Sequence, residues 1–306
     1  DTYRTLMAAD SAVMVIDASK GVEAQTRKLF KVCVMRHIPI FTFINKMDRE
    51  ARDTFELLDD IEKELGIATC PVNWPIGSGK AFKGVYDREH REIELFSDTQ
   101  KGTKMGEVKK ISLDDPELST LIEEDALSLL EEEVELLDGA SAEFDQELVS
   151  KGELSPVFFG SALTNFGVET FLQHFLSMTS SPLPRKSDKG EIDPMTEKDF
   201  SAFVFKIQAN MNKAHRDRIA FMRICSGEFE AGMEVYHMQG GRKVRLSQPQ
   251  QMMASERKMV EKAYGGDIIG VFDPGIFSIG DTLTTSAERF CYEGIPTFAP
   301  EHFARV

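Results

Sequence analysis

The feature that most constrains the fold is a short apolar run that ends in a polar tetrapeptide. Residues 40–44 are apolar, β-branched or aromatic and too few for a helix, which predicts a buried β-strand. The tetrapeptide Asn-Lys-Met-Asp, residues 45–48, follows where this strand ends. In a parallel α/β sheet, ligands bind at the carboxyl ends of the strands. The run therefore predicts a binding loop on a parallel sheet.

The chemistry of this tetrapeptide suits a guanine base. The carboxylate of Asp48 can accept from both the N1–H and the 2-amino group of guanine, a donor pair that adenine lacks. Asn45 can tie the loop to neighbouring backbone, and the methylene stem of Lys46, next to Met47, can lie along the ring. The alternative is a strand that ends in an ordinary solvated turn, because so short a motif also occurs by chance.

A second strand end supports the guanine interpretation. Residues 157–159 predict another apolar strand, which runs into Gly160 and then Ser161, Ala162 and Leu163. A turn of small residues presents backbone N–H groups, which can donate to O6 of guanine and would repel the amino group of adenine. Two loops suited to the same base favour a shared site over two unrelated turns.

Composition limits the class of protein. A length of 306 residues allows two domains with separate cores, and 42% hydrophobic with 28% charged residues is typical of a soluble globular protein. No apolar run approaches membrane-spanning length, so we expect no membrane partner. The four cysteines are scattered, which argues against a zinc site and a disulfide framework and fits the reducing cytoplasm.

The net charge of −15 would by itself argue against a nucleic-acid partner, and we expect no DNA partner, but the charge is unevenly distributed. Residues 114–153 hold fifteen acidic side chains and one lysine, whereas residues 200–288 hold eleven Lys or Arg against ten Asp or Glu. The sign of the overall net charge therefore says little about whether the second half of the chain binds nucleic acid. The acidic residues at about 116–150 predict helices with a solvated face; the alternative is docking to a basic protein surface.

The order of the elements predicts a parallel sheet. A strand at residues 12–16 is followed by a helix that ends before Pro39, then by the central strand and a second helix. That second helix begins with the capping-box pair Asp53 and Glu56 and ends at Gly66. Such alternation implies parallel strands with right-handed crossovers.

An insertion interrupts this alternation. Residues at about 67–113 are rich in Pro and Gly and predict a short antiparallel hairpin on the edge of the domain. Within it, residues 77–80 (Gly-Ser-Gly-Lys) predict a flexible turn. They do not fit a phosphate-binding loop, because Trp74 stands where the first Gly is required and Ala81 where Ser or Thr is required.

The second half of the chain predicts a β-barrel. After a helix at about residues 168–175 and a linker at 184–199, residues 200–288 alternate in polarity and are divided by Gly turns. We expect Phe203, Phe205 and Ile207 to share one face. Basic residues on its loops suit either an ordinary surface or contact with RNA phosphates: His215, Arg216, Arg218, Arg242, Lys243, Arg245, Arg257 and Lys258.

The predicted fold class is therefore α/β: an incomplete GTPase-type parallel sheet domain with an inserted β-hairpin, followed by an antiparallel β-barrel. The expected domains are a GTP-binding domain at residues 1–183, the linker, the barrel, and the start of a truncated third domain at 289–306.

These motifs resemble those of the translational GTPases. Residues 45–48 and 161–163 are similar to the two guanine-recognition loops of that family, and the barrel resembles the second domain its members share. Longer stretches specifically resemble its release factors of bacterial translation termination. They are residues 74–77, 203–211, 215–223, 263–270 and 295–301.

The resemblance covers essentially the whole chain, and it implies a ribosome-dependent GTPase. It implies GTP and GDP as ligands, with Asn45, Lys46, Met47, Asp48, Ser161, Ala162 and Leu163 as the residues that bind them. It implies the ribosome, its RNA and proteins, as the partner, and release of class-one release factors from it as the outcome.

The chain departs from the family pattern at its start. The family's phosphate loop, switch segments and catalytic His would precede Asp1. We therefore expect an internal fragment without catalytic or metal-ligating residues, with Mg²⁺ bound only when that segment is present. The alternatives are a translocase similar to elongation factor G and, for a chain natively this short, a non-catalytic ribosome-binding adaptor.

Overall fold

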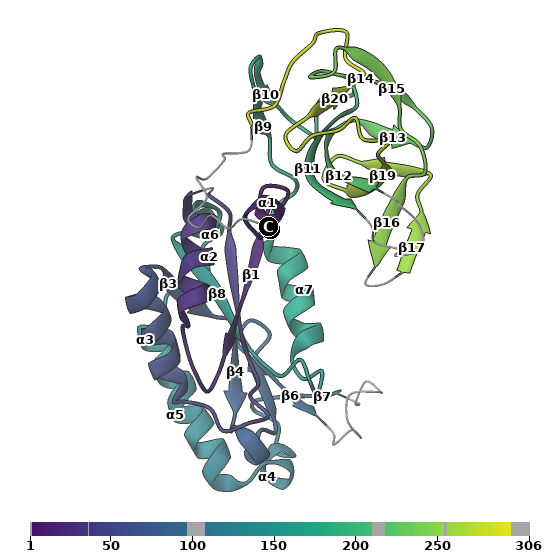
Figure 1. Ribbon diagram of the computed structural model, residues 1–306. Coiled ribbons are helices and arrows are strands. Elements are labelled where there is room, and N and C mark those ends of the chain that lie inside the picture. Colours follow the sequence, from purple (N-terminus) through teal and green to yellow (C-terminus); the bar gives the residue numbers. More distant parts are fainter. Residues whose placement is uncertain (1, 36, 97–107, 210–217, 254–255, 295–306) are drawn as a thin grey trace, which may run out of the picture. The chain divides into compact units, whose positions relative to one another are not determined.

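The computed structural model describes residues 2–35, 37–96, 108–209, 218–253 and 256–294. The chain forms two compact units, one of Ser11–Ser180 and the other of Asp1–Asp10 with Ser181–Val306 (Figure 1). In the part of the chain that the structure describes, no helix is both long and apolar enough to span a bilayer.

The first unit is built on the predicted parallel sheet. Its four strands lie in the order β1-β2-β8-β3, and every pairing is parallel. Every residue of β8, and every residue of β2 except the last, is buried, as expected of strands covered on both faces. The bounds are β1 Ala12–Asp17, β2 Ile40–Asn45, β3 Ala68–Pro71 and β8 Leu154–Phe159.

Helices cover both faces of this sheet. Figure 1 shows α2 (Ala24–Met35) and α3 (Thr54–Leu65) side by side on one face and α7 (Val168–Met178) on the other. Phenylalanines of the strands and of α7 pack edge to face, among them Phe41 with Phe175 at 4.9 Å between ring centroids. The predicted cap of α3 is confirmed, since the Asp53 side chain accepts from the Glu56 amide at 3.0 Å.

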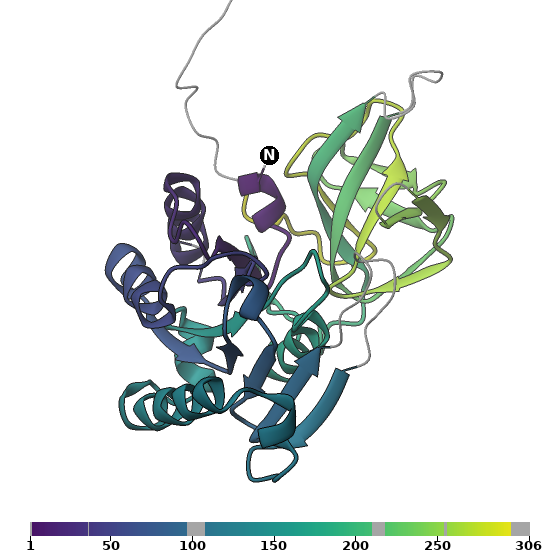
Figure 2. The same cartoon turned by 90° about the horizontal axis from the view of Figure 1, so that it is seen from below.

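The insertion is larger than the predicted hairpin. It forms a separate antiparallel sheet of four strands, β4-β5-β6-β7, beside α5 (Glu124–Ala140) and α7 (Figure 2). Its first strand was not predicted because it contains Pro75, and proline is compatible with a strand only at an edge, where β4 lies. Residues 68–71 form β3 of the parallel sheet. The bounds are β4 Asn73–Ile76, β5 Gly84–Asp87, β6 Glu92–Phe96 and β7 Val108–Ser112, with the 3₁₀ turn η1 Gly79–Ala81 between β4 and β5.

The acidic segment is helical, as predicted. It comprises α4 (Leu118–Leu121), α5 (Glu124–Ala140) and α6 (Gln146–Lys151). The apolar stripe of α5 is buried at Leu130, Val134 and Leu137, while the acidic residues of this helix lie mostly outward.

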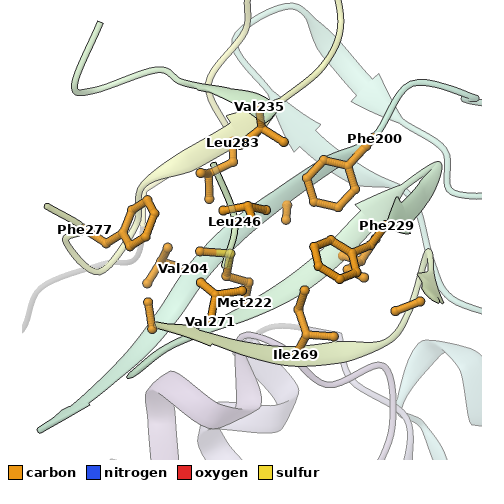
Figure 3. Packing of buried hydrophobic residues seen from close by; sticks show 14 of the residues in the cluster. Phe200, Val204, Met222, Phe229, Val235, Leu246, Ile269, Val271, Phe277 and Leu283 are labelled. Atoms are coloured by element: carbon orange, nitrogen blue, oxygen red, sulfur yellow. The ribbon is translucent and has the colours of Figure 1, made fainter. Parts of the chain in front are cut away.

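The second unit is a curled antiparallel sheet. Eight strands follow the order β15-β14-β20-β11-β12-β19-β16-β17, and β9–β10 and β13–β18 form two further pairs. Figure 3 shows the core inside this curl, where Phe200, Met222 and Phe229 point toward one another. The bounds are β9 Arg185–Ser187, β10 Gly190–Ile192, β11 Ser201–Ala209, β12 Arg218–Ser226, β13 Glu228–Glu230, β14 Glu234–His237, β15 Arg242–Arg245, β16 Gln250–Met253, β17 Glu256–Met259, β18 Lys262–Tyr264, β19 Ile268–Phe272 and β20 Thr282–Thr284.

One expectation about β11 was wrong. Phe203 and Phe205 share a face, but Ile207 packs against the core on the opposite face. The register between β11 and β12 shifts between Val204 and Lys206, which is the signature of a β-bulge. Because a bulge inserts one residue into the alternation, it turns the residues that follow to the other face.

The first residues of the chain pack within this second unit. After the short helix α1 (Thr2–Leu6), Met7 and Ala8 join a buried cluster with Phe203 and Phe205. The guanidinium of Arg223 donates to the carbonyl of Ala8 at 2.9 Å and to the carboxylate of Asp10 at 2.5 Å.

Candidate functional site

Three neighbouring strands of the parallel sheet lead to polar residues at one edge. In the register of the sheet Asp17 of β1 lies opposite Asn45 of β2, and Ile44 of β2 lies opposite Phe159 of β8. The Asn45–Asp48 loop and the Gly160–Leu163 loop therefore leave the sheet side by side. The carboxyl edge of a parallel sheet is where such folds bind ligands.

Two side-chain hydrogen bonds join the two loops. The Asn45 side-chain oxygen accepts from the Ala162 amide at 2.9 Å and also from the Lys46 amide at 2.8 Å. The Ser161 hydroxyl donates to Oδ1 of Asp48 at 2.5 Å. The structure thus brings together residues that are 113 to 117 positions apart in the chain.

The carboxylate of Asp48 keeps capacity for a ligand. Ser161 is fully buried and holds one carboxylate oxygen, whereas Asp48 itself is half-buried. A carboxylate offers two oxygens and about four acceptor positions, so one hydroxyl leaves room for two further donors. This is the donor pair that the sequence interpretation assigns to guanine.

Lys46 is held from both ends. Its backbone has φ of 72°, in the left-handed region that non-glycine residues rarely adopt, and strain of this kind clusters at binding sites. Its ammonium group contacts Oδ2 of Asp17 at 2.6 Å. This bond and a second one from the Ser19 hydroxyl hold the pKa of Asp17 well below its usual range. The methylene stem of Lys46 is therefore stretched between two anchors.

Asp17 was not among the predicted site residues, because the first strand was predicted only over residues 12–16. A usable signal was present, because Asp17 follows a strand predicted to be the neighbour of the central strand. Polar residues that end adjacent parallel strands meet at one edge of the sheet.

Met47 has a different position from its neighbours in the motif. Its side chain is buried, with 1% of its surface exposed. Its amide donates to the Gly160 carbonyl at 3.1 Å, and its carbonyl accepts from the Gly79 amide at 2.8 Å. Met47 therefore anchors the loop rather than presenting a side chain to a ligand.

The Gly-Ser-Gly-Lys turn, residues 77–80, contacts the Asn45–Asp48 loop through its backbone. The amide of Gly79 is directed toward the carbonyls of Met47 and Arg49, at 2.8 and 3.0 Å. A phosphate-binding loop needs its amides turned toward the ligand, whereas this amide braces the Asn45–Asp48 loop.

The approach of the two loops depends on Gly160. A Cβ atom at this position would lie 2.5 Å from the Phe166 carbonyl oxygen and 2.8 Å from the ring of Phe43. The Gly160 amide donates to the Ile44 carbonyl, which continues the contact with β2 past the strand end. The absence of a side chain lets the loops come together.

The amides proposed for O6 of guanine have partners within the protein. The Ser161 amide donates to the Phe166 carbonyl at 2.9 Å, and the Ala162 amide donates to Asn45. Ala162 and Leu163 are exposed, whereas Ser161 is buried. Only a shared, three-centre bond from Ala162 would serve both Asn45 and a base oxygen.

The basic residues of the second unit that were candidates for contact with RNA have different surroundings. Arg218 donates to the buried carboxylate of Asp273 at 2.6 Å and to the Phe277 carbonyl at 3.0 Å, which is a structural use. Arg242 and Lys258 are exposed. His215, Arg216 and the side chain of Arg257 lie outside the described part of the structure.

Two family models match different parts of the chain. Residues 1–181 match the model of the elongation factor Tu GTP binding domain, and residues 199–286 match that of elongation factor G domain 2.

Curated relatives match the full length of the chain. It is 61% identical over 306 residues to peptide chain release factor 3 of Symbiobacterium thermophilum, covering 100% of this chain and 58% of that protein. It is 55% identical to the protein of the same name from Gloeobacter violaceus, again over 100% of this chain and 57% of the relative. The chain thus spans somewhat more than half the length of these relatives.

A solved structure shares the fold. A crystal structure of a protein from Thermus thermophilus matches with a TM-score of 0.69 at 22% identity, over 94% of this chain and 42% of the other.

Proposed function

The chain belongs to the family of elongation factor Tu GTP binding domains, and on that premise we propose that its first unit binds GTP and GDP by the guanine base. The base lies at the edge formed by residues 45–48 and 161–163. Asp48 accepts from N1–H and the 2-amino group, and the exposed amide of Ala162 donates to O6. Leu163 borders the base, and Met47 holds the loop beneath it.

The remaining residues shape this site. Asn45 joins the loops through Ala162, and Ser161 orients the Asp48 carboxylate. The stem of Lys46 covers one face of the ring while Asp17 holds its ammonium group. The observation that carries the proposal is the pair of bonds between the loops, because two unrelated polar turns need no side chains reaching across to each other.

Base recognition is one part of the proposed activity. Binding of the phosphates and of Mg²⁺ is proposed for other residues of the full-length protein, because the two loops described here supply contacts to the base. We propose that the full-length protein is a GTP hydrolase of the cytoplasm that acts on the ribosome in translation termination and releases class-one release factors. The relatives named peptide chain release factor 3 support this over an elongation-factor-like translocase.

The domain assignment follows from the same proposal. Residues 1–183 are the GTP-binding domain, 184–199 the linker, 200–288 the barrel, and 289–306 the start of a third domain. Exposed Arg242 is a better probe of RNA contact than Arg218, which holds Asp273. Arg242→Glu should weaken ribosome binding and lower its salt dependence. An unchanged salt slope would assign Arg242 to ordinary surface.

The exchange Asp48→Asn tests the base site in the full-length protein. An asparagine amide can donate to the 2-oxo group of xanthine, so affinity should fall for GDP and rise for xanthosine diphosphate, each by at least about tenfold. Both affinities are measured by titration calorimetry. Asp59→Asn, at an exposed position on α3, is the control and should leave both unchanged. Unchanged GDP affinity in Asp48→Asn would refute the assignment.

A further inference from the structure

Two histidines and an aspartate converge between the inserted sheet and α7, away from the base loops in sequence. Asp87 ends β5, His90 lies in the turn before β6, and His174 lies on α7. Oδ2 of Asp87 is 2.9 Å from Nδ1 of His90 and 2.9 Å from Nε2 of His174. Together, one ligand atom from each residue lies within 4.8 Å of the others.

The backbone fixes the direction of the aspartate. Oδ1 of Asp87 accepts from the amides of Glu89 and His90, at 3.0 and 3.1 Å, and so closes the turn between β5 and β6. The other oxygen is left facing the two imidazoles. The side chains of Asp87 and His174 are buried, whereas that of His90 is 59% exposed. The cluster is therefore preformed inside and open to solvent on one side.

A fourth residue orients His174. Its Nδ1 lies 2.9 Å from the carboxylate of Glu89. Histidines that bind metals commonly donate the other ring N–H to a carboxylate, which fixes the tautomer. With the proton of His174 on Nδ1, its lone pair at Nε2 points toward Asp87 and His90.

Both ring nitrogens of His174 thus face carboxylate oxygens. Nδ1 is held by Glu89, which leaves Nε2 and the carboxylate of Asp87 as neighbouring donor atoms for a divalent cation. Two imidazoles and one carboxylate form a donor set that zinc accepts, with water as the fourth ligand.

The spacing is compatible with zinc. Ligand atoms at about 2.0–2.1 Å from one tetrahedral zinc are about 3.3 Å apart. The two separations of 2.9 Å would have to open by a few tenths of an ångström. The ligand nitrogens of His90 and His174, which lie within 4.8 Å of each other, would have to settle at the same spacing, and the exposed His90 can make that movement. We infer that Asp87, His90 and His174 form a zinc site, with Glu89 as the positioning residue that holds His174.

This site contains no cysteine, so it differs from the zinc sites that the scattered cysteines argue against. It would tie the inserted sheet to α7, the helix that follows the Ser161 loop. It does not depend on the proposed nucleotide function, because its test is metal binding without nucleotide.

The test is titration of the metal-free chain with zinc chloride, followed by calorimetry. We expect one zinc per chain, and changed imidazole signals of His90 and His174 in the ¹H–¹⁵N NMR spectrum. His90→Gln is the main variant, because its side chain is exposed and its loss spares the core; it should weaken zinc binding at least tenfold. Glu89→Gln should weaken it by about 10- to 100-fold, as loss of an orienting carboxylate does.

The matched control is His37→Asn, which changes an exposed histidine elsewhere in the same unit and should leave zinc affinity unchanged. The inference is overturned if the chain takes up no stoichiometric zinc. It is equally overturned if His90→Gln binds zinc as tightly as the unaltered chain. Either result would assign the cluster to a carboxylate–imidazole hydrogen-bond network.

Discussion

The exchange Ser161→Ala tests whether the Ser161 hydroxyl orients the carboxylate of Asp48 that is proposed to bind the base. The Ser161 hydroxyl is buried and donates to Oδ1 of Asp48 at 2.5 Å. Alanine removes this donor and leaves Asp48 itself unchanged. The proposed site requires Asp48 to be held toward the base before the nucleotide arrives. Affinity for GDP should therefore fall without any gain in affinity for xanthosine diphosphate.

The size of the effect follows from the contact. A hydrogen bond to a charged group contributes about 1.5–3 kcal/mol. Because Asp48 is half-buried, water can replace part of the lost bond, which places the loss near the lower figure. Since about 1.4 kcal/mol corresponds to a factor of ten, GDP affinity should fall by about tenfold.

The assay is calorimetric titration of the full-length protein with GDP, paired with urea unfolding. Ser155→Ala, on the strand β8 that leads into the Ser161 loop, is the matched control, because the Ser155 hydroxyl is also buried but bonds to Thr42 and to the Ile40 carbonyl. It should lower stability by about 1–3 kcal/mol and leave GDP affinity unchanged. The reasoning fails if Ser161→Ala binds GDP within twofold of the unaltered protein, or if Ser155→Ala loses as much affinity.

Three further predictions concern the first unit. Gly160→Ala should destabilise it by about 1–3 kcal/mol in urea and weaken GDP binding, because the new methyl group meets the Phe166 carbonyl and the Phe43 ring; unchanged unfolding would mean that the loops tolerate separation. Asp17→Asn should make the free energy of unfolding depend less steeply on pH in the acid range. The lowered pKa of Asp17 contributes stability that is complete above its unfolded value of about 3.9 and is lost as pH falls below it; an identical pH dependence in urea titrations at pH 7, 4 and 3 would contradict this. Leu130→Ala should cost about 2–5 kcal/mol, whereas Leu129→Ala, one residue along α5 and 55% exposed, should cost less than about 0.5 kcal/mol; equal costs would show that the outer face of α5 is covered.

Much of the first unit was predictable because its signals are local. The apolar run of β2 and its polar end are contiguous in the chain, and so are β8 and the Ser161 loop. Parallel pairing of these strands then requires the two loops to meet at one edge. The predicted residues Asn45, Asp48 and Ser161 do meet there.

Features that depend on a single residue were not predictable. The bulge in β11 reverses the face of Ile207, yet Phe203 to Ile207 alternate in sequence as an unbroken strand would. Pro75 concealed an edge strand, because proline usually signals a break. In each case the partner strand decides the outcome, and sequence alternation carries no information about that partner.

The zinc cluster shows the same limit at a candidate site. Asp87 and His90 are three residues apart, a spacing that a tight turn explains without a ligand. The buried histidine that completes the cluster is 87 residues from Asp87, on a helix where one face must pack against the sheet in any case. Each part has an adequate structural explanation alone. Their meeting, with both nitrogens of a buried imidazole facing carboxylates, is the observation on which the zinc inference rests, and only the folded chain brings it about.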